Sequence, residues 1–160
     1  MMIVIDANGK VTEGSALRLG ETRSTSVSPN GEIPDTPVEW RRYQCNECKR
    51  EFRARNGLLM IHDCDRAFSH NGLSPLVLFV EQGGTSPLRA TIEGTALAED
   101  SVSALLIERG YRPLPGRSRR FSHFTTSDAV EELRKALEAQ GVGVIFEEHR
   151  RVAAPSRASQ

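Results

Sequence analysis

The sequence predicts an α+β fold, in which a small cysteine-containing unit precedes a two-layer α+β domain with two helices. Two observations predict the domain: over residues 75–149, short apolar runs typical of strands alternate with two segments whose apolar residues recur at helical spacing. The third observation is that all three cysteines lie within residues 39–70. Because the turn-forming stretch Asn71–Pro75 lies between these two regions, it is the expected boundary.

Residues 1–38 are expected to form a hairpin followed by a linker. Apolar Met2–Ile5 and the segment from Val11 flank Asn8-Gly9, a dipeptide that favours tight hairpin turns, which predicts a β-hairpin over residues 1–19. Residues 20–38 are rich in Ser, Thr, Pro and Gly and predict a flexible linker. At the other end, residues 150–160 predict a disordered tail.

Three strands and two helices are expected in the α+β domain. The strands are predicted at Leu76–Glu81, Leu88–Gly94 and Val142–Glu147. The first helix is predicted over residues 98–109, because it begins with acidic residues and a glycine follows it. The second begins at Thr126–Asp128 and ends at Gly141.

A cluster of metal-ligand residue types lies in the cysteine-containing unit. Cys45 and Cys48 are separated by two residues, a spacing that lets both thiolates bind one Zn²⁺. A structural zinc needs four N or S ligands, so we predict Cys45, Cys48 and His62 with either Cys64 or His70 as the fourth. Cys64 is preferred because thiolate binds zinc well and the connecting loop is shorter. The alternative interpretations are a redox Cys-x-x-Cys pair and cysteines buried in a small core.

Residues 40–64 resemble the ββα zinc-finger family with two Cys and two His. Besides the ligands, the resemblance rests on Tyr43, on Phe52 and on Leu59 three residues before His62, and it leaves more than four fifths of the chain unmatched. It implies a β-hairpin, a short helix carrying His62, and bound Zn²⁺. The chain departs from the family pattern, because thirteen residues rather than twelve separate Cys48 from His62. On a continuous helix Cys64 would point about 200° away from His62, so the helix would have to end near His62.

Nucleic acid, DNA in preference to RNA, is the partner that the resemblance implies. The family's base-reading positions fall on Arg55, Leu58 and Ile61, and two apolar side chains cannot read base donors or acceptors. We therefore predict phosphate contacts rather than sequence readout. The predicted nucleic-acid-binding residues are Arg41, Arg42, Lys49, Arg50, Arg53 and Arg55 in the unit, and Arg117, Arg119 and Arg120 in a second basic stretch.

Two alternatives remain for these surfaces. In the second basic stretch, Tyr111, Phe121 and Phe124 offer rings for base stacking, or the arginines neutralise acidic residues of 76–108 in the same domain. The cysteine-containing unit could instead be a protein-interaction module whose helix exposes the apolar residues Leu58, Met60 and Ile61.

Composition narrows the function classes further. Lys+Arg and Asp+Glu both number 21, which excludes a uniformly basic or acidic protein. We find no catalytic residues, because the chain has no nucleophile elbow, no phosphate-binding glycine loop and no zinc-deaminase motif. Without a signal or membrane segment, a soluble, cytoplasmic (intracellular) protein is expected. The excess of Arg over Lys suggests a bacterial or phage origin.

Overall fold

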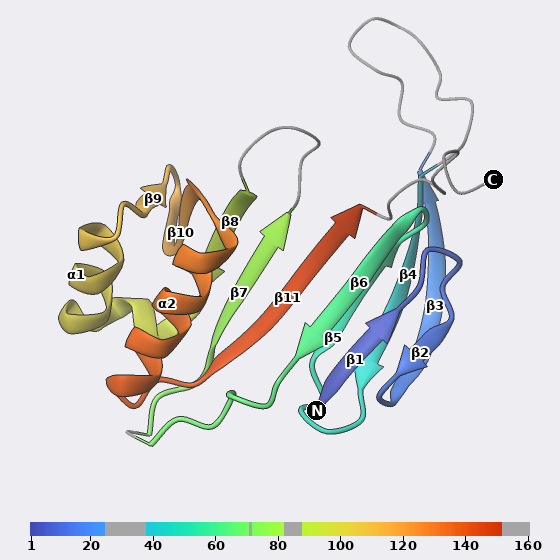
Figure 1. Ribbon diagram of the computed structural model, residues 1–160, viewed down its shortest axis with the longest axis horizontal. Coiled ribbons are helices and arrows are strands. Elements are labelled where there is room, and N and C mark those ends of the chain that lie inside the picture. The colour runs from blue at the N-terminus through green and yellow to red at the C-terminus, as the bar shows by residue number, and fades with distance from the viewer. Residues whose placement is uncertain (25–37, 71, 82–87, 152–160) are drawn as a thin grey trace, which may run out of the picture. The chain divides into compact units, whose positions relative to one another are not determined.

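The computed structural model describes residues 1–24, 38–70, 72–81 and 88–151 (Figure 1). The chain divides into two compact units: an N-terminal unit of Ile3–Ile61 with the residues from His149 onward, and a C-terminal unit of Met1–Met2 with His62–Glu148. The division therefore falls within strands, and not at residues 71–75, where the sequence predicts a boundary. Most of the predicted linker and tail lies outside the described residues.

The N-terminal unit is built of strands. They are β1 (Met2–Ile5), β2 (Val11–Glu13), β3 (Ala16–Ser24), β4 (Val38–Cys45), β5 (Glu51–Arg55) and β6 (Leu58–Asp63). β1 pairs with β2 in the antiparallel sense, and β3, β4 and β5 form a three-stranded antiparallel sheet (Figure 1). β3 runs to Ser24, so residues 20–24 form strand where linker was expected.

The helix predicted to carry His62 is absent. Residues Leu58–Asp63 form strand β6, which follows a turn at Asn56-Gly57 in which the glycine has φ 83°. Burial along the segment alternates, because Met60, His62 and Cys64 are buried and the residues between them are less so. This is the period of a strand with one face in the core. The ββα arrangement implied by the resemblance is therefore corrected in its helical part.

The C-terminal unit contains both helices. Its elements are β7 (Leu76–Glu81), β8 (Leu88–Glu93), the short 3₁₀ helix η1 (Thr95–Ala98), α1 (Asp100–Glu108), β9 (Arg112–Leu114), β10 (Arg117–Thr125), α2 (Ser127–Ala139) and β11 (Val144–Arg151). The strand order is β11-β7-β8-β10-β9 (Figure 1). Apolar residues of both helices pack with those of the strands in one core. The predicted α+β class with two helices is confirmed.

Helix α2 begins at the residue that its sequence marks. The Thr126 hydroxyl accepts a hydrogen bond from the amide of Ala129 (3.2 Å), which satisfies one of the unpaired donors of the first turn.

The second basic stretch differs from expectation, because residues from Arg117 onward form β10 rather than a loop. Among the described residues, no helix combines the length and apolar character that crossing a bilayer requires.

Tyr111 provides a test of the core of the C-terminal unit. Its side chain is 2% exposed, and its hydroxyl has no hydrogen-bond partner among the described residues. Because a buried hydroxyl without a partner costs free energy, we expect Tyr111→Phe to raise the free energy of unfolding by about 1 kcal/mol in urea titrations at pH 7. Tyr43→Phe is the control, since the Tyr43 hydroxyl donates to the carbonyl of Gly9 (2.6 Å) and its loss should destabilise.

Tyr111→Phe should also change how the free energy of unfolding falls at alkaline pH. Burial raises the pKa of Tyr111 from 10.0 to about 12. The unfolded chain therefore loses the phenol proton before the folded chain does, so this contribution is present below pH 10 and is lost as the pH rises toward 12. Wild type should lose more stability than Tyr111→Phe between pH 9 and 11. Equal losses would contradict the burial of this hydroxyl.

Candidate metal centre

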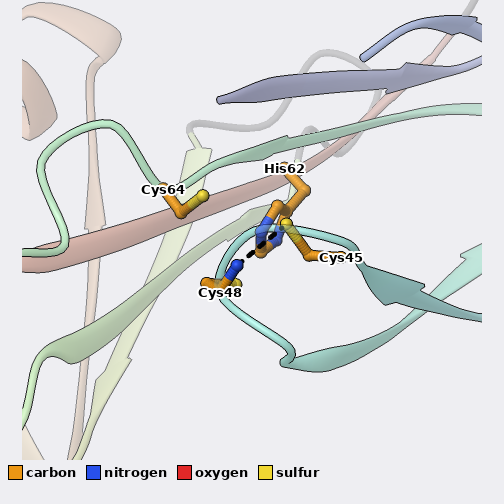
Figure 2. A group of neighbouring side chains, drawn as sticks. All are labelled: Cys45, Cys48, His62 and Cys64. Atoms are coloured by element: carbon orange, nitrogen blue, oxygen red, sulfur yellow. Dashed lines mark hydrogen bonds between the residues drawn. The ribbon is translucent and has the colours of Figure 1, made fainter. Parts of the chain in front are cut away.

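Four side chains with metal-ligating atoms lie together: Cys45, Cys48, His62 and Cys64 (Figure 2). One ligand atom from each lies within 4.8 Å of the others, and all but the half-buried Cys48 are buried. These are the four residues predicted from the sequence. His70, the predicted alternative, is exposed and is not in this group.

The turn after β4 positions the first two sulfurs. Cys45 ends the strand, its amide donates to the carbonyl of Arg50 (3.0 Å), and the amide of Lys49 donates back to its carbonyl (3.0 Å). Lys49 has φ 64°, the left-handed conformation that lets the chain reverse tightly. The Cys48 amide thereby points at the sulfur of Cys45 (3.4 Å), a contact that favours the thiolate form needed by a metal.

Strand β6 and the residue after it position the other two ligands. His62 lies in β6, and Cys64 follows the strand by one residue. Because side chains two residues apart in extended backbone point to the same side, the pair can approach one ion together. The spacing that a helix could not accommodate is therefore explained by a strand.

A buried carboxylate holds the imidazole of His62. Nδ1 of His62 lies 2.8 Å from Oε2 of Glu147 on β11, and these side chains are 0% and 4% exposed. A carboxylate can only accept here, so Nδ1 carries the proton and the lone pair belongs to Nε2, as in many metal-bound histidines. Sequence reasoning missed Glu147. The available signal was a carboxylate that directly follows the apolar run Val144–Phe146.

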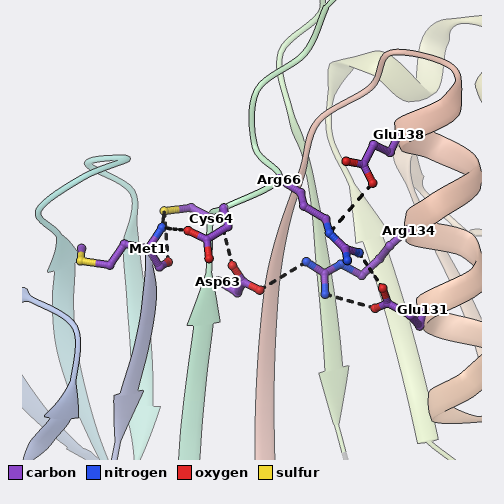
Figure 3. A network of polar contacts seen from close by, with 8 residues as sticks. Met1, Asp63, Cys64, Arg66, Glu131, Arg134 and Glu138 are labelled. Atoms are coloured by element: carbon purple, nitrogen blue, oxygen red, sulfur yellow. Dashed lines mark hydrogen bonds and ion pairs between the residues drawn. The ribbon is translucent and has the colours of Figure 1, made fainter.

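Asp63, between the two ligands of this segment, belongs to a second polar network (Figure 3). Arg134 of α2 donates to Asp63 (3.4 Å) and to Glu131 (3.4 Å), while Arg66 pairs with Glu131 (2.6 Å) and with Glu138 (4.0 Å). Arg134 is 7% exposed, so these ion pairs are partly shielded from water. The segment that carries His62 and Cys64 is thus tied to helix α2.

The donor set is chemically suited to a metal ion. A tetrahedral zinc held at about 2.3 Å by thiolates separates its sulfur ligands by roughly 3.8 Å, which the 4.8 Å limit of the group accommodates. None of these three cysteines forms a disulfide bond within the described residues. With Glu147 behind the histidine, the group has both the ligands and the outer-shell support of a metal site.

Glu147 should tune the affinity for metal. Replacing a carboxylate that orients a metal-bound histidine typically weakens binding 10- to 100-fold, and we expect a loss of about this size for Glu147→Gln. The measurement is competition for Zn²⁺ with a chromophoric chelator. Glu148→Gln, one position along β11, is the control, since its side chain points to the other face of the strand. An equal loss in both variants would mean that Glu147 acts only through stability.

The predicted phosphate-binding residues of the hairpin β4–β5 separate onto its two faces. Arg42 lies directly opposite Arg53, and Trp40 directly opposite Arg55, so these four side chains share one face. We call them the basic sheet face. Arg41 lies on the other face, where its side chain is 14% exposed and pairs with Glu39 (3.1 Å). Of the remaining two, Lys49 is exposed in the turn and Arg50 is half-buried beyond it.

The second basic stretch offers fewer arginines for phosphate contacts than the hairpin β4–β5 does. Arg120 pairs with Glu93 on the neighbouring strand (Nε to Oε2, 2.9 Å), which is the intramolecular neutralisation that was one of the two interpretations. Arg119 is exposed, and Arg117 is described here by its backbone alone. Tyr111 and Phe121 are buried in the core, so the idea that they stack on bases is wrong.

The apolar surface expected for a partner protein does not form. Met60 is 1% exposed, Leu58 and Ile61 are half-buried, and the three lie on a strand rather than a helix.

Comparisons of the chain with protein-family models, with curated proteins and with solved structures found no match. The resemblance of residues 40–64 to a zinc-finger family therefore stays a prediction from those residues.

Proposed function

We propose that this chain is a zinc-binding protein that binds nucleic acid largely through phosphate contacts. One observation carries the proposal: the hairpin β4–β5 holds two of the four candidate ligands in its turn and three arginines on one face. An ion bound at the turn would fix the geometry of the hairpin, and the hairpin would then present its arginines on a rigid surface.

Zinc is the ion that this donor set favours. Three thiolates and one imidazole form a soft, four-ligand set typical of tetrahedral structural zinc sites, while Mg²⁺ and Ca²⁺ prefer oxygen. A catalytic zinc keeps one position open for water, whereas four protein ligands close the coordination shell. We therefore propose a structural ion and no enzymatic activity.

The charge of the basic sheet face supports nucleic acid as the partner. The Arg42 side chain is 46% exposed, and its guanidinium has one distant carboxylate, that of Glu51 (3.8 Å). Within the described parts of the chain, no carboxylate forms an ion pair with Arg53 or Arg55. Exposed guanidinium groups that no close carboxylate neutralises can bind phosphate, which suits their planar, forked donors.

The salt dependence of binding tests the proposal. Zinc-loaded protein is titrated onto a fluorescently labelled oligonucleotide, of DNA and of RNA, and anisotropy gives Kd. Three phosphate contacts on a single strand correspond to a slope of about −2 in log K against log salt, so affinity should fall about 20-fold between 50 and 200 mM salt. A Kd that does not change with salt concentration would instead indicate an apolar interface, and the proposal of phosphate contacts would be wrong.

A further inference from the structure

Resting on the proposed function, we further propose that the basic sheet face binds single-stranded nucleic acid. An unpaired base stacks on the contact between Trp40 and Arg53, while Arg42, Arg55 and the donor edge of the Arg53 guanidinium bind the flanking phosphates. The proposal adds a ligand class and a base-binding residue, Trp40, to a surface otherwise argued from charge alone.

The stacking pair is held in place before any ligand arrives. The guanidinium carbon of Arg53 lies over the Trp40 ring, 5.2 Å from its centroid, in a cation–π contact. The ring of His149 lies 5.8 Å from that of Trp40, and its Nε2 is 2.9 Å from the carbonyl oxygen of Arg53. These contacts restrict both side chains, so little conformational entropy is lost when a base stacks on them. Aromatic rings and guanidinium planes are the surfaces on which unpaired bases stack.

The sheet surface beside this pair is open. Gly20 of β3 lies directly opposite Arg42, and a Cβ added at Gly20 would meet no atom of the described residues within 4 Å. Arg53 and Arg55 are exposed on the neighbouring strand. A glycine in a strand interior removes a side chain from the surface, which allows another chain to approach the backbone closely. Beside Arg42, a nucleic-acid strand can therefore approach the backbone of β3 closely.

The shape of this surface favours a single strand over a duplex. The major groove is about 12 Å wide and admits a helix or a two-stranded ribbon. The face spans β3, β4 and β5, whose backbones alone extend roughly 10 Å across, before side chains are added. The helix that would have entered the groove is strand β6. A flat face with a stacking pair and flanking arginines matches the features of single-strand binding sites.

Trp40 reports directly on stacking because it is the chain's only tryptophan. Zinc-loaded protein is titrated with an oligothymidine, with an abasic oligomer of the same length, and with a duplex. We expect the oligothymidine to quench Trp40 fluorescence and to bind about 10-fold more tightly than the abasic oligomer, which has the phosphates without the bases. The duplex should bind more weakly than the single strand.

Two variants separate stacking from folding. Trp40→Leu should bind the oligothymidine and the abasic oligomer equally. Gly20→Val should leave thermal stability unchanged or raised, because the added Cβ meets no atom of the described residues and valine favours strands, yet it should weaken oligothymidine binding about 10-fold. The control is Thr12→Val on β2, an exposed position outside the basic sheet face, which should bind as wild type does.

The outcomes distinguish the two proposals. Equal affinity for oligothymidine and the abasic oligomer, with unchanged fluorescence, would overturn base stacking and leave the phosphate-binding function standing. Tighter binding of the duplex, or wild-type affinity in Gly20→Val, would also overturn the single-strand proposal. Absence of binding to all three nucleic acids would refute the proposed function and this inference together.

Discussion

Cys45→Ser is expected to abolish stoichiometric zinc binding and to unfold the hairpin β4–β5. Cys45 is fully buried, and its sulfur accepts the hydrogen bond that closes the Cys48 turn. Structural zinc contributes an apparent binding free energy of about 10–16 kcal/mol in small domains, far more than the few apolar residues of this hairpin can supply. Metal analysis should find about one zinc per wild-type chain and almost none in the variant. Amide resonances of β4 and β5 should lose their dispersion.

The matched pair for this experiment is Cys64→Ser and His70→Ala. Cys64 belongs to the four-residue group and His70 does not, so the first variant should lose zinc and the second should retain it. Zinc retained by Cys64→Ser but lost by His70→Ala would reverse the assignment of the fourth ligand. Metal-free wild type with fully dispersed resonances over residues 39–64 would show that the ion does not hold this segment.

Replacing Arg42, Arg53 and Arg55 together by glutamine is expected to remove most nucleic-acid affinity at low salt. Each arginine is assigned one phosphate, so the slope of log K against log salt should become less steep by about 2 for a single strand. The loss should shrink as salt rises, because screening weakens the same contacts in wild type. Anisotropy titrations at four salt concentrations give both quantities.

Arg18→Gln is the matched control for charge. Arg18 lies on β3 opposite Tyr43, which places it on the reverse face of the same sheet, and it already pairs with Glu21. Its replacement should leave the slope unchanged. An equal reduction in both proteins would indicate that overall charge, rather than the basic sheet face, drives binding. A reduction confined to Arg119→Gln would move the interface to β10.

Local chemistry was sufficient to predict several elements. Leu76–Glu81 was predicted with the bounds that β7 has, because an apolar run this short, with turn-forming residues on both sides, is typical of a buried strand. Both helices were found because their apolar residues recur at helical spacing between capping residues and glycines. The Cys-x-x-Cys turn was predicted because two residues between two thiolates constrain the backbone directly. Each of these signals lies within a few residues of sequence.

The secondary structure of the segment from Leu58 to Cys64 could not be predicted from local sequence patterns. Its apolar run fits a helix or a strand equally, and the alternating burial of Met60, His62 and Cys64 appears only once one face of β6 is packed. Glu147 is far from His62 in sequence, so their hydrogen bond depends on which strands meet. The shared face of Trp40, Arg42, Arg53 and Arg55 likewise depends on the register of β4 against β5.

The amino-acid sequence by itself therefore determined the α+β class, the helices and the identity of the candidate ligands. Tertiary structure decided the secondary structure around His62, the carboxylate that orients it, and which arginines share a surface. The physical reason is the separation along the sequence of the residues that interact. Helix periodicity, capping and turn spacing depend on near neighbours along the chain. Strand pairing and burial are set by residues tens of positions apart, and a shift of one residue in register moves every side chain to the opposite face.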